Sequence, residues 1–225
     1  MATITGELTN SEYRAVNRWS NSDIYMVNRD PGLIEWSRKV KSEGSKAVNL
    51  GTWLHSAILE PDDFEKSYRQ LPNYGSSKSD QAAKDAMILS LGRAGKTTIP
   101  YDEYEKVIAM RDSLLSHPTI KKLLTSEGKS EQSIFWELEG VKLKARPDRI
   151  VDPSVFCRHI IVDVKKTDDA RKFEKSIIEY EYHTQAAFYS DAYHQLTGEL
   201  PLFLFAVVGE RRSIGRHPVR LVSID

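Results

Sequence analysis

The chain has 225 residues, of which 40% are hydrophobic and 28% are charged, a composition typical of globular proteins. Lysine and arginine together balance aspartate and glutamate at 32 each, so any nucleic-acid site must be a local patch rather than a global basic field. The single cysteine, Cys157, excludes an intrachain disulfide, a four-cysteine zinc site and a four-cysteine iron–sulfur cluster. No apolar run approaches the ~20 residues of a membrane span, and the N-terminus lacks the apolar core of a signal peptide. We therefore expect no membrane association and a cytoplasmic setting.

The N-terminal part of the chain, residues 1–125, is expected to be mostly helical. Tyr13, Val16 and Trp19 recur at three-residue steps, which indicates a short amphipathic helix. A second helix is expected at 33–40, directly after a turn sequence.

The clearest helical pattern in this part is an apolar stripe just before a proline. Its members recur at helical spacing: Leu50, Trp53, Leu54, Ala57 and Ile58. Pro61 ends this helix. His55 lies at the rim of the stripe, where a histidine is most often an ordinary surface residue, so a metal-ligand role for it needs support from elsewhere in the chain.

Residues 71–100 are expected to form a flexible loop or connector around a short helical piece. Within it, the stretch that begins at Gly92 resembles a phosphate-binding loop, but only Arg93 and Ala94 separate that glycine from Gly95, where the motif needs four residues. No strand precedes it, and we reject an ATP site. A further helix is expected to end before Pro118.

After residue 125 the pattern changes from helices to strands. The expected strands are 131–136, 141–150, 160–165, 201–208 and 219–223, with a long helix at 170–196 before the fourth. Glu139-Gly140 indicates a hairpin between the first two strands. This order predicts an α/β fold with a mixed central β-sheet flanked by helices. We expect a single domain over 1–225, with its αβ core at 126–225.

Two carboxylates and a lysine stand out at the end of an expected buried strand. Asp163 and Lys165 should share one face of the strand that begins at Ile160, because side chains alternate along a strand. With Asp148, fifteen positions earlier, they form a set that suits Mg²⁺ and leaves room for a phosphate. An aspartate and a lysine separated by one residue also occur by chance on many surface strands. The apolar strand favours the metal site, because charges there are costly to bury unpaired.

On the long helix, Gln185 and Tyr189 stand four positions apart and share a face. His183 is close in sequence but is rotated away from that face. The simpler interpretation makes the residues between them plain packing, with the glutamine and the tyrosine at its wet edge.

Four segments of this sequence, in this order, resemble the PD-(D/E)XK nuclease superfamily, and more narrowly the C-terminal nuclease domain of RecE (exonuclease VIII) and its phage relatives. They are Leu50-Gly51-Thr52-Trp53-Leu54-His55, Ala145-Arg146-Pro147-Asp148-Arg149, Val162-Asp163-Val164-Lys165 with the five residues after it, and Tyr182-His183-Thr184-Gln185-Ala186-Ala187-Phe188-Tyr189. The resemblance covers most of residues 20–210.

The resemblance implies a role for each matching residue. The implied metal ligands are His55, Asp148, Asp163 and the backbone carbonyl of Val164, with Glu131 as an additional acidic residue. The implied catalytic residues are Lys165, Asp148, Asp163, Gln185 and Tyr189, with Lys165 as the catalytic lysine and the last two lining the site near the scissile strand. The implied cofactor is Mg²⁺, for which Mn²⁺ is expected to substitute.

The resemblance also implies an activity and partners. It implies a 5′→3′ exonuclease that acts on double-stranded DNA ends, releases 5′-phosphomonoesters and leaves a 3′ single strand for phage-type recombination. It further implies a ring-like homo-oligomer and a single-strand annealing partner of the RecT type, in a bacterial or phage-infected cell. The chain departs from the expected pattern at Lys166, where we expect threonine, and it stops at Asp225, earlier than we expect.

Three other interpretations remain open from the sequence. A restriction-type endonuclease would fit the lysine triplet but gives no reason for His55 or for the pair on the long helix. A non-catalytic module that binds DNA ends would fit a decayed site, although Asp148, Asp163 and Lys165 are all present. An unrelated α/β protein would place the histidine and the two aspartates far apart.

Overall fold

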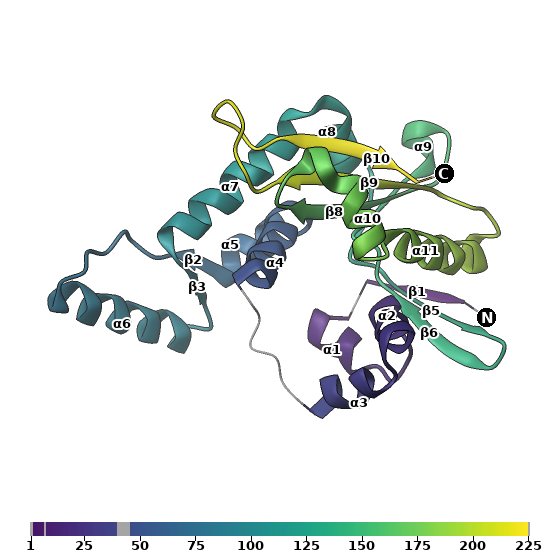
Figure 1. Cartoon of the computed structure of the whole chain (residues 1–225), viewed down its shortest axis with the longest axis horizontal. Helices are drawn as coiled ribbons and strands as arrows, with labels where there is room; N and C mark the ends of the chain where they lie inside the picture. The colour runs from purple at the N-terminus through teal and green to yellow at the C-terminus, as the bar shows by residue number, and fades with distance from the viewer. Residues whose placement is uncertain (1, 7, 40–45, 225) are drawn as a thin grey trace.

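The computed structural model describes residues 2–6, 8–39 and 46–224 (Figure 1). Its centre is a five-stranded sheet in the order β10-β9-β8-β7-β4. The strands are β4 (Gly128–Ser130), β7 (Arg149–Val151), β8 (Ile160–Thr167), β9 (Leu202–Gly209) and β10 (Val219–Ser223). β8 and β9 are parallel and the other neighbours are antiparallel, so the sheet is mixed, as predicted.

A smaller sheet packs beside the central one and consists of β1 (Thr3–Thr5), β5 (Ser133–Leu138) and β6 (Val141–Ala145). Glu139 and Gly140 join β5 to β6 with φ of 51° and 81°, which is the left-handed backbone of a tight hairpin. This hairpin was predicted. The expected strand 141–150 is wrong, because the chain leaves the small sheet after Ala145 and enters the central sheet only at Arg149.

The expected loop at 71–100 is also wrong for most of its length. It contains the sixteen-residue helix α6 (Lys78–Arg93), which Ser77 caps, and the strand β3 (Thr97–Ile99). β3 pairs in parallel with β2 (Tyr68–Gln70), and α6 forms the connection between them (Figure 1). None of the residues of α6 is buried, so the helix has only a weak hydrophobic pattern. The turn residues at each end of the segment therefore led to the prediction of a loop.

The N-terminal helices are short, and side-chain caps fix the starts of the first two. They are α1 (Asn10–Ala15), α2 (Asn21–Arg29) and α3 (Gly32–Lys39). Thr9 and Ser20 each form a capping box. α1 ends before Trp19, whose backbone pairs with β6 instead, so the helix predicted from the spacing of Tyr13, Val16 and Trp19 is wrong in its second half. The helix predicted at 33–40 is α3; Val40 lies outside the described residues.

One face of the central sheet is covered by four helices. They are α4 (Lys46–Leu59), α5 (Pro61–Ser67), α7 (Tyr101–Ser116) and α8 (Pro118–Thr125). Val162 and Val164 of β8 enter the core on this side, together with Leu54 of α4. The predicted helix ends before Pro61 and Pro118 are both confirmed.

The other face of the sheet is covered by α10 (Phe173–Glu179) and α11 (Tyr182–Thr197), which follow the short 3₁₀ helix Ala170–Lys172. The short helix α9 (Pro153–Phe156) lies between β7 and β8. The single helix expected at 170–196 is wrong, because Glu181 has a φ of 51° and separates α10 from α11. Its predicted end is confirmed at Gly198, which has a φ of 80°.

A partly buried ion cluster joins the carboxyl ends of β8 and β9 to α7. Glu210, just after β9, pairs with Lys106 of α7 and with Lys166 of β8, whose Nζ lies 2.7 Å from Glu210 Oε2. Lys166 is the position where threonine was expected, and this pairing accommodates the lysine. Burial alone would raise the pKa of Glu210, but the hydrogen bonds and charges of the two lysines outweigh it and lower the pKa to about 2.

We predict that Glu210→Gln lowers the melting temperature at pH 7 by about 2–4 °C, which corresponds to a loss of about 1 kcal/mol. The folded-state pKa lies below the unfolded value of 4.5, so this stabilisation is fully present above pH 4.5 and disappears as the pH falls through about 2. Thermal melts of the parent and the variant should therefore converge in acid. Glu65→Gln, at an exposed position, is the control, and equal melting temperatures at pH 7 would contradict the prediction.

Candidate active site

The site lies where β7 ends beside β8 and leaves part of β8 without a neighbouring strand. β7 pairs with β8 only as far as Arg149, which is opposite Val162. Asp148, the residue before β7, accepts a hydrogen bond at Oδ2 from the backbone amide of Val164, at 2.7 Å. The end of one strand therefore places a carboxylate where the next strand would otherwise have a free amide.

His55 reaches the same carboxylate from α4. Its Nδ1 lies 3.3 Å from Asp148 Oδ2, and its side chain is partly exposed to the cavity. The pattern that placed His55 at the rim of its helix explains this position, because the core side of α4 packs on the sheet and the rim faces the end of β7. The interpretation as an unrelated protein, in which these residues lie far apart, is wrong.

Asp163 and Lys165 share the face of β8 that looks toward α11, as predicted. Asp163 is 1% exposed, and its Oδ2 lies 2.7 Å from Lys165 Nζ. The other oxygen, Oδ1, accepts a hydrogen bond of 2.9 Å from Gln185 Nε2 of α11. Lys165 Nζ also lies 4.7 Å from the centre of the Tyr182 ring.

Burial controls the ionisation of this pair. Burial raises the pKa of Asp163 to about 6, although Lys165 opposes the shift. Burial alone would lower the pKa of Lys165, but the charges of Asp163 and Asp148 outweigh it and raise the pKa above its ordinary value. Lys165 is therefore an ammonium ion at neutral pH, and it donates hydrogen bonds.

Glu131 completes the acidic part of the site. It has a φ of 51°, and its backbone amide donates to the carbonyl of Asp148 at 3.1 Å. Burial, followed by the charges of Asp148 and Glu60, raises the pKa of Glu131 to about 8. One ligand atom from each of His55, Glu131 and Asp148 lies within 4.8 Å of the others, which is the spacing of a metal site.

These residues fit a divalent cation on two grounds. The donor set of carboxylate oxygens and one imidazole suits a hard or borderline metal ion. In addition, the buried Asp163 carboxylate has the ammonium of Lys165 at Oδ2 and the amide of Gln185 at Oδ1, and among the described residues Oδ2 accepts no hydrogen bond of normal geometry. A cation beside Asp148 would also offset the burial and the neighbouring negative charges that raise the pKa of Glu131.

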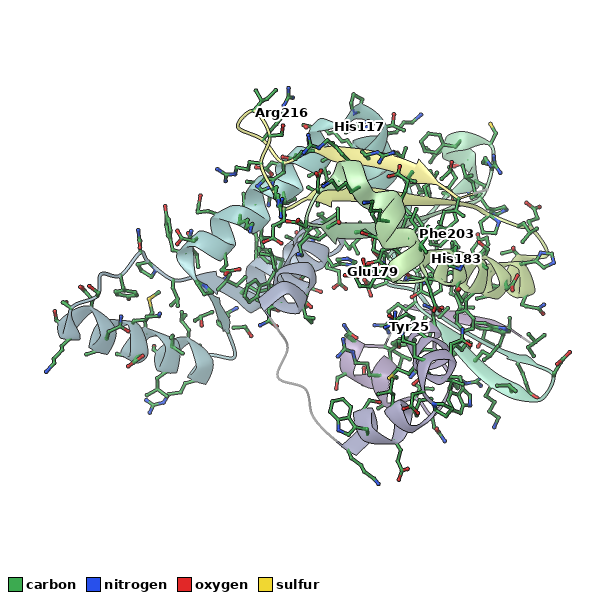
Figure 2. All side chains as sticks on the ribbon, viewed as in Figure 1. Tyr25, His117, Glu179, His183, Phe203 and Arg216 are labelled. Carbon is green, nitrogen blue, oxygen red and sulfur yellow. The ribbon has the colours of Figure 1, made fainter. Side chains whose placement is uncertain are left out.

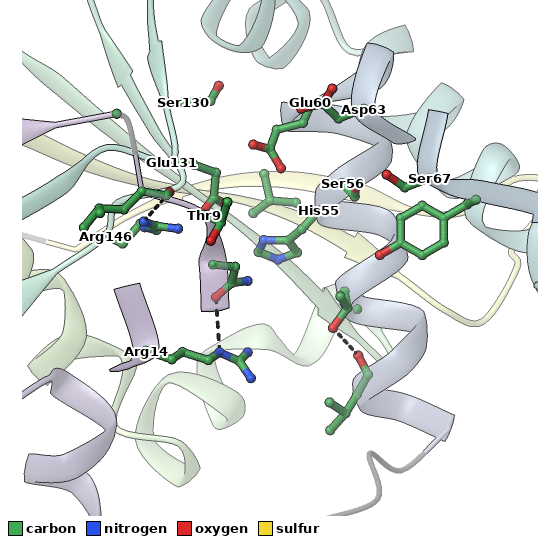
Figure 3. A pocket seen from close by; sticks show the side chains of 18 of the residues that line it. Thr9, Arg14, His55, Ser56, Glu60, Asp63, Ser67, Ser130, Glu131 and Arg146 are labelled. Carbon is green, nitrogen blue, oxygen red and sulfur yellow. Dashed lines mark hydrogen bonds between the residues drawn. The ribbon is translucent and has the colours of Figure 1, made fainter. Parts of the chain in front are cut away.

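A cavity of about 700 Å³ opens over this site (Figure 3). His55, Glu131, Val164 and Lys165 line it, and the backbone of Val164 lies at its floor because its side chain is buried in the core. A second cavity, of about 620 Å³, shares Arg146 with it and is lined by Gln185 and Tyr189. The two residues that were predicted to share a helix face thus meet at this second cavity.

Tyr189 and His183 differ in their surroundings as predicted. Tyr189 packs against Phe203, with ring centres 6.3 Å apart. Burial raises the pKa of Tyr189 well above its ordinary value, so it is a neutral phenol beside Gln185. His183 is exposed on the same helix.

Two charged residues at the site were not identified from the sequence. Arg146 is buried, donates to Ser133 Oγ at 3.0 Å and lies 4.3 Å from the centre of the Tyr13 ring, so it supplies a positive charge at the wall of both cavities. Glu60 points into the first cavity from the start of α5 (Figure 3). The only sequence signal for Glu60 was its position five residues after His55.

A mixed sheet flanked by helices, with Asp148, Asp163 and Lys165 gathered where one strand ends beside another, defines a domain of the PD-(D/E)XK class. The chain belongs to a family of PDDEXK-like domains of unknown function (DUF3799), whose model matches residues 30–214. The predicted superfamily is thereby confirmed.

Comparison with solved structures supports the same fold. The chain is similar to the crystal structure of a candidate exonuclease from Eubacterium rectale, with a TM-score of 0.65 and 15% sequence identity over 98% of this chain and 79% of the other. At this identity the likeness shows the fold, and the predicted restriction-endonuclease-like core is confirmed. No curated protein matches the sequence. Among the described residues, no helix has both the length and the hydropathy to cross a membrane.

We predict that Glu131→Gln stabilises the metal-free protein at pH 8 by ~2 kcal/mol, or several degrees in melting temperature. The folded-state pKa lies above the unfolded value of 4.5, so the parent loses stability as the pH rises from 4.5 to about 8, whereas the variant does not. Melts in a chelator at pH 4.5 and pH 8 test this, with Glu137→Gln on the exposed part of β5 as the control. A constant difference at both pH values would contradict it.

Proposed function

We propose that the protein is a Mg²⁺-dependent exodeoxyribonuclease that degrades linear double-stranded DNA in the 5′→3′ direction and leaves 3′ single strands. The observation that carries this proposal is the ion pair of Asp163 and Lys165 beside the cluster of His55, Glu131 and Asp148. His55, Glu131 and Lys165 line one cavity. Metal-dependent phosphodiester hydrolysis uses a metal site and a further positive charge beside the same phosphate, and the residues at this cavity offer both.

The metal ligands we propose are the side chains of His55, Glu131, Asp148 and Asp163, together with the backbone carbonyl of Val164. When bound there, Mg²⁺, or Mn²⁺ in its place, would lower the pKa of water and offset negative charge on the phosphate. Glu131 must release its proton to act as a ligand, because its pKa is about 8 without a cation.

Lys165 supplies the positive charge of the protein at the reacting phosphate. As an ammonium ion it donates hydrogen bonds to the attacking water and to phosphate oxygens. The ring of Tyr182 on one side and Asp163 on the other hold its position. Its role is therefore to orient the water and to stabilise the charge that develops in the transition state.

Gln185 and Tyr189 act on the other side of the pair. Gln185 donates to Asp163 Oδ1, which leaves Oδ2 directed toward Lys165. Tyr189 stays neutral, so its hydroxyl can donate a hydrogen bond at the second cavity, where Arg146 supplies charge. Gln185 thus positions the carboxylate, and Tyr189 faces the strand that enters the site.

The resemblance to the RecE nuclease domain extends the proposal beyond the chemistry. We propose release of 5′-phosphomonoesters, assembly of several copies into a ring around DNA, and a single-strand annealing partner of the RecT type. The setting would be the cytoplasm of a bacterial or phage-infected cell, in recombination between DNA ends.

Digestion of linear duplex DNA against closed circular duplex tests the activity. With Mg²⁺, the linear DNA should be consumed from its 5′ ends and the circle should survive, while EDTA or Lys165→Ala stops the reaction. Duplexes labelled at the 5′ or the 3′ end distinguish the direction of degradation, since only the 5′ label should appear early as mononucleotide.

Each other outcome selects a different function. Cutting of the circle would identify an endonuclease on the same fold. Binding of duplex ends without hydrolysis would identify a non-catalytic module. Release of the 3′ label first would reverse the proposed direction and leave the site intact.

We predict that Gln185→Ala lowers kcat about 10–100-fold, because Asp163 loses the donor that orients it. KM for DNA should change much less, since Gln185 acts through a carboxylate at the metal. His183→Ala, on the same helix but exposed, should leave kcat within about twofold. An unchanged kcat in Gln185→Ala, measured at saturating DNA, would exclude this positioning role.

A further inference from the structure

A third cavity, of about 520 Å³, adjoins the site cavity beyond the end of β8. The two cavities share Val48 of α4 and Lys166 of β8. Its other walls come from the 3₁₀ helix, from α10 and from the start of α11, and they include Lys172, Lys175 and Tyr180. A strand of substrate in the site cavity can therefore continue into this one without leaving the protein surface.

The charges around the third cavity are arranged so that two lysines remain available. The lining carboxylates Asp168 and Asp169 are paired with Arg211 and Arg171 respectively, and the lining Lys166 is paired with Glu210. Lys172 and Lys175 are exposed, and neither has an ion pair among the described residues. One lining carboxylate, Glu179, remains against these two ammonium groups.

Two aromatic rings, Tyr180 and Tyr182, lie in a row between this cavity and Lys165. Tyr180 is 50% exposed, and its ring centre lies 5.7 Å from that of Tyr182. Tyr182 is stacked on the buried Phe173, with centres 5.7 Å apart, and its ring lies 4.7 Å from Lys165 Nζ. The exposed ring of Tyr180 thus packs against Tyr182, which is itself fixed by the buried Phe173 beside Lys165.

The break between α10 and α11 brings the rings of Tyr180 and Tyr182 together. In one continuous helix, Tyr180 and Tyr182 would lie about 200° apart and on opposite faces. The left-handed backbone of Glu181 reverses this and brings the two rings together. Arg29 of α2 donates a hydrogen bond of 3.2 Å to the carbonyl of Glu179, and this contact stabilises the break between the helices. Figure 2 labels Tyr25 on α2 and Glu179 at the end of α10.

We propose that the third cavity binds a single-stranded segment of DNA next to the reacting phosphate, with Lys172 and Lys175 on its phosphates and Tyr180 stacked on one base. This deepens the proposed function and rests on it. Inside a duplex both faces of a base are covered by its neighbours, so an exposed ring at a cavity wall stacks most readily on a base of an unpaired strand. Lysines beside an exposed aromatic ring are the pattern of single-strand binding.

Binding of a fluorescein-labelled oligothymidylate in EDTA, measured by fluorescence anisotropy over a range of salt concentrations, tests this proposal. Replacing both Lys172 and Lys175 by glutamine should reduce the slope of log affinity against log salt by ~1.4, at ~0.7 for each lost phosphate contact. Tyr180→Ala should weaken binding about tenfold at every salt concentration, while Tyr180→Phe, which keeps the ring, should bind like the parent.

The matched control replaces Lys78 of α6 and Lys121 of α8 by glutamine. Both are exposed and line none of the three cavities, so the total charge changes equally. Equal salt slopes in the two double variants would overturn the proposal. So would a loss of duplex binding in Lys172→Gln/Lys175→Gln with single-strand binding unchanged.

Binding in EDTA is independent of hydrolysis, so the two proposals can fail separately. If the parent hydrolyses DNA but the lysine and tyrosine variants bind oligothymidylate normally, the inference fails and the nuclease stands. If the variants lose binding as expected but no condition yields hydrolysis, the cavity stands and the nuclease fails. Unchanged thermal melts establish that each variant is folded.

Discussion

The site depends on the burial of one carboxylate, Asp163, in the middle of the central sheet. An isolated charge there would cost several kcal/mol, and the structure offsets this with the ammonium of Lys165 and the amide of Gln185. The parallel strand β9 closes one side of β8, so the access to Asp163 lies on the side where β7 ends. Because β7 ends there, the backbone amide of Val164 is left without a partner strand and donates a hydrogen bond to Asp148 instead. A single interruption of the sheet therefore positions both Asp148 and Asp163.

The same arrangement concentrates negative charge beyond what the local cations offset. Glu131 and Glu60 line one cavity, and Asp148 and Asp163 are buried beside it. Burial, followed by repulsion from neighbouring carboxylates, raises the pKa of Glu131 and of Asp163. The metal-free protein therefore holds protons where a divalent cation would displace them. The site is thus organised before substrate binds, and this arrangement lowers the stability of the metal-free protein. Such a loss of stability is common at functional sites.

The periodicity of the sequence predicted the side-chain faces of elements that run without interruption. Alternation along β8 placed Asp163 and Lys165 on one face, because the pairing of β8 with β9 runs without interruption from Ile160 to Thr167. Helical periodicity placed His55 at the rim of α4. Periodicity carries no information about distance between elements, however, so the contact of His55 with Asp148 rested on the family resemblance. Arg146 was missed as a site residue because its position at the wall of two cavities is set by the N-terminal helices, which the sequence pattern described poorly.

Two of the errors, at the expected strand 141–150 and the expected helix 170–196, fall where the backbone departs from local preference, and both places border the cavities. Glu131 and Glu181 adopt left-handed φ without glycine, and the chain leaves the small sheet between Ala145 and Arg149 inside an apparently continuous strand. Each departure costs free energy that only tertiary contacts offset. Each one also positions a side chain: Glu131 itself and Asp148 after the strand break at the site, and Tyr180 before the helix break at the third cavity. An interpretation based on periodicity extends each element through these points, so it misses the breaks in the backbone that place these side chains.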